Sequence, residues 1–126
     1  MSGGLLRLSG LWPPFGAAVR YFLNCTDQQS LPVTILEGYR SAADQAARYA
    51  QGRTPWEIQH HIRKHGLGGS VTDAPPGESP HQYGLAVDIS SPDIQAARWI
   101  AQQIGFGTVT WDVPHIEWPN WRSLLG

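Results

Sequence analysis

The sequence predicts an α+β fold in which helices flank a small, largely antiparallel sheet. Three observations lead to this prediction. Apolar residues recur at helical spacing in some segments, short apolar and β-branched runs lie between turn signals in others, and tight turns join the two kinds of segment. A chain of 126 residues is about one domain long, so residues 1–126 are expected to form a single domain with one core.

The composition excludes several classes of protein. A net charge of -1 provides no basic surface for a phosphate backbone, so we expect no nucleic-acid partner. No segment approaches the roughly 20 apolar residues that cross a bilayer, so we expect no stable membrane association. The single cysteine excludes an intramolecular disulfide framework, and any metal would need His, Asp or Glu ligands.

The N-terminal third is predicted to begin the fold with a helix. The run Gly4–Trp12 is short, is interrupted by Arg7 and lacks a cleavage site, so we expect no signal peptide and assign this run to the mature fold. A helix follows Pro13 and Pro14. Its predicted apolar face comprises Phe15, Ala18, Phe22 and Cys25. Cys25 is therefore expected to be a buried thiol.

A strand and two helices are predicted next. The β-branched run 33–36 indicates a strand. Ser41, three residues before Asp44, resembles a capping box for an alanine-rich helix that ends near Gly52. A second such signal at Thr54 starts a short helix that is expected to reach about His65.

The remaining segments complete the predicted sheet. A short strand from Ser70, a turn at 74–77 and a strand at 85–89 come first. The last helix starts at residues 91–93 and ends at Gly105, and two short strands follow at 108–110 and 114–117. The apolar stripe of this helix comprises Ile94, Ala97, Ala101 and Ile104.

Strand alternation brings candidate metal ligands together. In the strand 85–89 the alternate residues Leu85, Val87 and Ile89 face the core. Asp88 then shares the opposite face with Ala86, whose small side chain leaves room for a ligand. Gly84 allows the chain to bend back, so that His81 converges on Asp88.

The same alternation applies to the run 113–117. It buries Ile116 and places His115 and Glu117 on the polar face, while Pro114 fixes the backbone ahead of His115. Two histidines and one aspartate match the ligands of a catalytic zinc ion with one position open for water, and Asp112 is placed to act as the base. Spacing alone leaves open that these are ordinary surface or turn residues.

A resemblance to a known family narrows this choice. Residues 79–88 (SPHQYGLAVD) resemble the SxHxxGxAxD signature of the D,D-carboxypeptidase and VanY-like zinc peptidases, the M15 group, and 111–115 (WDVPH) resembles their second signature. Residues 71–77 and 37–41 are similar to the phage endolysin branch, which cuts the L-alanyl-D-glutamate bond of peptidoglycan stem peptides. The resemblance implies a hedgehog/DD-peptidase-like fold.

The resemblance also implies roles for individual residues. One catalytic zinc ion would be bound by His81, Asp88 and His115. Asp112 would be the catalytic carboxylate, although many relatives have Glu there, and Arg40 would lie near the reacting carbonyl. A surface salt bridge of Arg40 with Glu37 or Asp44 is the alternative.

Other polar residues have two interpretations each. Ser79 and Tyr83 are candidates for substrate binding or for structuring the turn, and Glu117 either orients a histidine ligand or replaces Asp112 as the base. His61 and His65 lie four apart, and with His60 they are expected to belong to a polar helix covering the cleft as a lid rather than to a second metal site. The tryptophans at 56, 111 and 118 line the groove or belong to the core.

The leading functional hypothesis is a zinc peptidase of the endolysin type whose partners are peptidoglycan stem peptides. Such a protein is expected to be a monomer, made in the host cytoplasm without a signal peptide and acting on the wall in the periplasm after holin-type release. The alternatives are a D-Ala-D-Ala carboxypeptidase and a non-catalytic zinc-containing peptide-binding module. A serine triad of Ser79, His81 and Asp112 is a poor third, because no GxSxG elbow is present.

Overall fold

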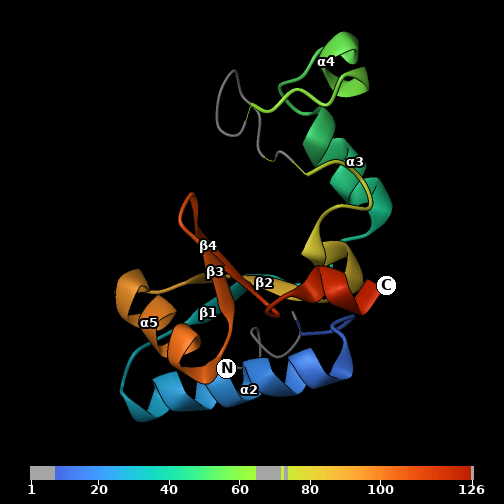
Figure 1. The fold of residues 1–126 in the computed structure, drawn as a ribbon. Helices are drawn as coiled ribbons and strands as arrows, with labels where there is room; N and C mark the ends of the chain where they lie inside the picture. Colours follow the sequence, from blue (N-terminus) through green and yellow to red (C-terminus); the bar gives the residue numbers. More distant parts are fainter. Residues whose placement is uncertain (1–7, 65–71, 73, 126) are drawn as a thin grey trace.

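The computed structural model describes residues 8–64, 72 and 74–125 (Figure 1). In chain order its elements are α2 (Pro13–Gln28), β1 (Thr34–Glu37), α3 (Ala42–Ala50), α4 (Pro55–Gln59), the 3-10 helix η1 (Pro80–Tyr83), β2 (Ala86–Ser90), α5 (Ile94–Ile104), β3 (Gly107–Val109), β4 (Asp112–Glu117) and the 3-10 helix η2 (Trp121–Leu125). These elements confirm the predicted α+β class.

The sheet has four strands in the order β1-β2-β4-β3, and every neighbouring pair is antiparallel. The pairing of β2 with β4 places Val87 opposite Ile116 and Asp88 opposite His115. Because side chains alternate along a strand, the first pair faces the core and the second pair faces the other side of the sheet. This register is what positions the candidate site.

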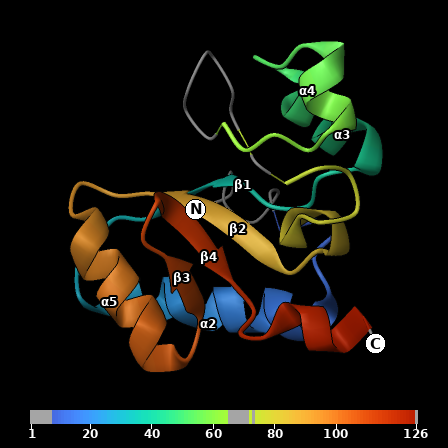
Figure 2. The ribbon, with the colours of Figure 1, turned by 45° about the horizontal axis from the view of Figure 1, so that its top comes forward.

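The core lies between the sheet and the helices α2 and α5, which pack against each other (Figures 1 and 2). The rings of Phe15 and Phe22 from α2 meet the ring of Phe106 edge-on, at centroid distances of 5.6 and 6.0 Å. Full burial of such a side chain contributes about 1.5–3 kcal/mol. The α5 stripe is confirmed at Ala97 and Ala101, which are completely buried.

The buried face of α2 differs from the predicted one. Phe15, Val19, Phe22 and Thr26 are buried, whereas Cys25 is half-buried. At about 100° per residue, Thr26 lies roughly 20° from Phe15 around the helix and Cys25 roughly 80° away. Thr26 tolerates burial because its Oγ1 donates a hydrogen bond to the Leu23 carbonyl at 2.9 Å. The prediction of a buried Cys25 thiol is therefore wrong.

The two predicted helix starts of the middle segment are confirmed. The Ser41 hydroxyl accepts a hydrogen bond from the Asp44 amide at 3.1 Å, and Thr54 and Glu57 form a reciprocal capping box. The end of the second helix was predicted too late, because α4 ends at Gln59 and His61 has a left-handed φ of 53°. Figures 1 and 2 show α3 and α4 together, apart from α2 and α5.

The segment before η1 contains the predicted turn, in which the Glu78 amide donates to the Pro75 carbonyl at 3.0 Å. The predicted strand from Ser70 falls largely outside the described residues, and Thr72 and Ala74 are not in a strand. Their carbonyls accept side-chain hydrogen bonds from Arg53 and Gln45 instead of strand partners. Residues 8–11 continue the predicted fold, since Leu8 and Leu11 belong to the core.

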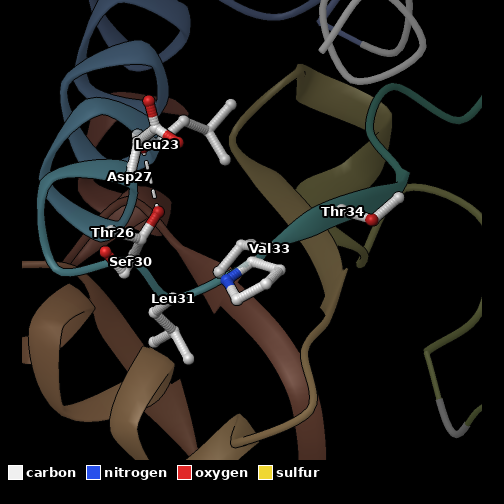
Figure 3. Close-up of a pocket in the computed structure, with 8 residues that line it drawn as sticks. Leu23, Thr26, Asp27, Ser30, Leu31, Val33 and Thr34 are labelled. Atoms are coloured by element: carbon white, nitrogen blue, oxygen red, sulfur yellow. Dashed lines mark hydrogen bonds between the residues drawn. The ribbon is translucent and has the colours of Figure 1, made fainter.

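Two further features concern surfaces. Within residues 8–64, 72 and 74–125, no helix combines the length and apolar character that a membrane span requires. A pocket lies where α2 leads into β1, lined by residues that include Leu23, Asp27 and Ser30 (Figure 3). None of the predicted site residues lines this pocket.

Candidate metal centre

Three side chains from separate elements converge on one point. His81 comes from η1, Asp88 from β2 and His115 from β4. The Asp88 Oδ1 atom lies 3.4 Å from His81 Nε2 and 3.5 Å from His115 Nδ1, and the three donor atoms all lie within 4.8 Å of one another. The predicted convergence is thus present in the structure.

Gly84 allows η1 to turn back onto β2. Its φ is 69°, in the left-handed region that favours glycine. A Cβ at this position would lie 2.6 Å from the Gly10 carbonyl oxygen and 2.7 Å from the Trp12 nitrogen. Gly84 is therefore required both for the turn beside His81 and for the close approach of residues 10–12.

Both histidine rings are oriented by a hydrogen bond on their far nitrogen. His81 Nδ1 lies 2.8 Å from the Gly38 carbonyl oxygen, and because a carbonyl only accepts, Nδ1 carries the hydrogen. His115 Nε2 lies 2.7 Å from Glu117 Oε1 in the same manner. In their neutral forms, the rings present lone pairs on His81 Nε2 and His115 Nδ1 toward Asp88, as metal-binding histidines do.

The Asp88 Oδ1 atom is buried and has no hydrogen-bond partner within the described part of the chain. An orphaned buried carboxylate oxygen is costly, and a cation held between it and the two imidazole nitrogens would satisfy it. Two neutral imidazole nitrogens and one carboxylate oxygen form a ligand set typical of zinc. The residues therefore fit a zinc ion.

Without a metal, the three groups perturb one another's pKa values. Burial alone would lower the pKa of His115, but attraction to the nearby Asp88 carboxylate and the hydrogen bond and charge of Glu117 outweigh it and raise the pKa to about 9. Burial alone would raise the pKa of Asp88, yet His115 and His81 hold it well below its usual range. A protonated His115 thus places a positive charge between the Asp88 and Glu117 carboxylates.

Arg40 lies beside this cluster and is almost fully buried. Its Nη2 is 4.0 Å from Asp88 Oδ2 and 2.5 Å from Glu37 Oε1, so the Glu37 pair offered as the alternative does exist, but in a buried setting. Glu37 is shared with Arg48, whose Nη2 lies 2.7 Å from Oε2. Glu37 thus holds the Arg40 guanidinium beside Asp88 and also pairs with a second, more exposed guanidinium, that of Arg48.

The remaining predicted residues divide into two groups. Asp112 lies on the open side, with Oδ2 3.9 Å from His115 Nδ1 and a side chain that is 39% exposed. Glu117 contacts the opposite nitrogen of His115, which suits an orienting residue better than a base. Ser79 accepts a hydrogen bond from the His81 amide and Tyr83 donates one to the Gly77 carbonyl, so both structure the turn, and their substrate contacts remain predictions.

One polar residue at the site has no counterpart in the sequence-based prediction. Gln45 is completely buried, and it accepts a hydrogen bond from Arg40 Nη1 at 2.6 Å and donates one to the Ala74 carbonyl. On an alanine-rich helix a glutamine is usually solvent-facing. The available signal was its i, i+4 spacing to Tyr49, the other buried residue of α3.

The candidate tryptophan and histidine residues of the groove differ in burial and in position. Trp118 packs on the core, with its ring 5.1 Å from that of Trp12, whereas Trp56 and Trp111 are 59% and 72% exposed. His60 stacks on Trp56 at 4.1 Å. His61 lies beyond the end of α4 and His65 lies outside the described residues, so the lid remains a prediction.

Comparison with known proteins identifies peptidoglycan peptidases as relatives of this chain. The family model described as VanY: D-alanyl-D-alanine carboxypeptidase matches residues 11–112. The peptidoglycan L-alanyl-D-glutamate endopeptidase CwlK of Bacillus subtilis is 34% identical over 95 residues, which cover 75% of this chain. The aligned region is 44% of the length of CwlK, so the chain corresponds to less than half of that relative.

Two solved structures have a similar fold. The L-Ala D-Glu endopeptidase ChiX of Serratia marcescens has a TM-score of 0.56 at 20% identity, with 98% of this chain and 91% of ChiX covered. The vancomycin-resistance D,D-pentapeptidase VanY, in complex with Zn(II), has a TM-score of 0.59 at 16% identity, with 91% of this chain and 76% of VanY covered. These similarities confirm the predicted DD-peptidase-like fold.

Proposed function

The chain belongs to the VanY family of D-alanyl-D-alanine carboxypeptidases, and on that premise we propose that it is a zinc-dependent peptidase that hydrolyses the L-alanyl-D-glutamate bond of peptidoglycan stem peptides. The observation that carries the proposal is the cluster of two oriented imidazole nitrogens around the orphaned Oδ1 of Asp88. The names of CwlK and ChiX, both L-Ala-D-Glu endopeptidases, support this choice of bond.

His81, Asp88 and His115 would hold one zinc ion. When bound, zinc supplies Lewis acidity that polarises the scissile carbonyl and lowers the pKa of water toward about 7. Glu117 and the Gly38 carbonyl keep the two rings in the orientation that binding requires.

The proton transfers are assigned to Asp112. Its carboxylate stands on the open side of the cluster, where it can accept a proton from the attacking water and return it to the leaving amine. Arg40 is held by Glu37 and Gln45 with its guanidinium directed toward the cluster, so its charge can stabilise the oxyanion that develops on the carbonyl.

The cleaved bond is tested by mass spectrometry of purified peptidoglycan after digestion. New amino-terminal D-Glu residues on the released peptides are expected. The description of the family favours a D-Ala-D-Ala carboxypeptidase as the second candidate, and free D-alanine without new D-Glu termini would establish that activity instead. Release of neither product by zinc-loaded protein would mean a peptide-binding module, and Asp112→Asn is the matched inactive control.

The proposal includes a lytic role of the endolysin type, as a monomer made in the host cytoplasm that reaches the periplasmic wall through a holin-type pore. The residue patterns 37–41 and 71–77 support this branch. Cytoplasmic expression alone should leave a Gram-negative culture turbid, whereas co-expression with a holin should clear it. Clearing by the Asp112→Asn variant to the same extent would contradict an enzymatic cause.

A further inference from the structure

A buried arginine from α5 spans the hairpin that carries Asp112. Arg98 is 7% exposed, and its Nη1 donates to the Val113 carbonyl at 2.6 Å and to the Asp112 carbonyl at 3.5 Å. Its Nη2 donates to the Val109 carbonyl at 3.2 Å. One planar guanidinium therefore bonds to both strands of the hairpin, on either side of its turn, and α5 contacts both strands.

The hairpin is poorly suited to hold its own shape. Val109 pairs with Asp112, so the loop consists of Thr110 and Trp111 alone, and the register shifts between Thr108 and Val109. Two-residue hairpin loops favour type I′ or II′ turns, which need a positive φ and match the twist of the strands. Neither loop residue has a positive φ. The turn itself is therefore not of a type that matches the twist of the strands, and Arg98 links the two strands beside it.

Side chains of the described residues hold the Asp112 carboxylate only loosely. Within the described residues no hydrogen bond holds its oxygens, and its Oδ2 lies 3.9 Å from His115 Nδ1. The direction of this side chain is consequently set by the backbone from which it projects. The Asp112 and Val113 carbonyls, to which Arg98 donates, belong to that backbone.

Burying a guanidinium contributes little to the stability of a fold, because its desolvation costs free energy. Removing the charge from water costs several kcal/mol, and no carboxylate among the described residues forms an ion pair with Arg98. An apolar side chain of similar volume often stabilises such a site as well or better. What the guanidinium provides and an apolar group cannot is a fixed direction for three carbonyls.

We propose that Arg98 is a positioning residue that orients the Asp112 carboxylate toward the metal cluster. The inference rests on the proposed function of Asp112. The hydrogen bonds given for Arg98 go to carbonyls of the hairpin and to none of the three proposed ligands, so it acts through the hairpin backbone.

The test is a double-mutant cycle of Arg98→Met with Asp112→Asn, in which kcat, KM, zinc content and melting temperature are measured for each zinc-loaded variant. Arg98→Met should lower kcat by about 10–100-fold, since a misplacement of about 1 Å has such an effect, while KM and zinc content stay close to those of the original protein. In the Asp112→Asn background the same change should cause no further loss of kcat.

Arg53→Met is the matched control. Arg53 is also buried and also donates to backbone carbonyls, those of Tyr49, Ile62 and Thr72, but none of them belongs to the hairpin. Any effect of Arg53→Met on kcat should be equal with and without Asp112→Asn. If Arg98→Met does not fold, Arg98→Lys, which keeps the cation but lacks the planar fork, replaces it in the same cycle.

Three outcomes would overturn the proposal, in distinguishable ways. An unchanged kcat in the folded Arg98 variant, or an equal loss of kcat in both backgrounds, refutes the positioning role alone. An unchanged kcat in the single variant Asp112→Asn refutes the assignment of Asp112 as the base, and the role of Arg98 falls with it.

Discussion

Raising the pH should destabilise the metal-free protein, because His115 loses the proton that binds it to Asp88 and Glu117. The pKa of His115 is raised from its ordinary 6.5 to about 9. A group with a raised pKa contributes stability that is complete below its unfolded pKa and is lost as the pH rises through its folded pKa. The loss should therefore fall between pH 6.5 and about 9.

The size of this effect follows from the two pKa values. At about 1.4 kcal/mol per pH unit, the difference between 6.5 and 9 corresponds to roughly 3 kcal/mol of unfolding free energy. Asp88 does not alter the slope, because its lowered pKa affects stability only in acid, below its ordinary value of 3.8. Glu117→Gln removes one of the two carboxylates that raise the pKa of His115 while keeping an acceptor for its ring, so it should reduce the slope.

The assay is urea unfolding of chelator-treated protein from pH 6 to 9.5, with the His115 ring titration followed by NMR. Glu78→Gln is the charge-matched control, since it removes an exposed carboxylate that is not a partner of His115. Zinc binding near pH 7.5 should also release about one proton from His115, measured by calorimetry in buffers of different ionisation enthalpy. A stability that is flat from pH 6.5 to 9, or equal slopes for Glu117→Gln and the original protein, would refute the reasoning.

Three further predictions concern the site and its support. Replacing any one of the three proposed ligands by alanine should remove both zinc and activity, by elemental analysis and digestion assay, and a variant retaining both would exclude that residue as a ligand. Arg40→Ala should lower kcat more than it raises KM, because its charge acts on the oxyanion; a pure rise in KM would make it a substrate-binding residue. Gly84→Ala should cost about 2–4 kcal/mol in unfolding free energy, more than Gly105→Ala, whose φ is also positive but whose Cβ would meet nothing.

The positions of the candidate ligands were accessible from the sequence because they depend on local periodicity. Alternation within β2 and β4 determines which side chains point away from the core, and it places Asp88 and His115 on the ligand-facing side whatever the pairing of the two strands. Helix starts at Ser41 and Thr54 were equally accessible, since a cap lies within three residues of the amide that it satisfies.

Two other features of the fold depend on contacts between segments that are distant in the sequence. The buried face of α2 includes Thr26 in place of the predicted Cys25, because the side of α2 that is covered depends on where α5 and the rest of the core lie. The helix α4 ends early, before the left-handed residue His61. Neither outcome follows from spacing along one element.

The orientation of the side chains at the site depends most clearly on the tertiary structure. His81 takes its ring direction from the Gly38 carbonyl, 43 residues away, and Gln45 joins Arg40 to the Ala74 carbonyl across 29 residues. A backbone carbonyl has no side-chain identity, so such a partner leaves no pattern in the sequence. The sequence by itself determined which donors are available and on which face they lie, whereas the tertiary structure decided which nitrogen each ring presents, because that choice depends on hydrogen bonds between segments that only folding brings together.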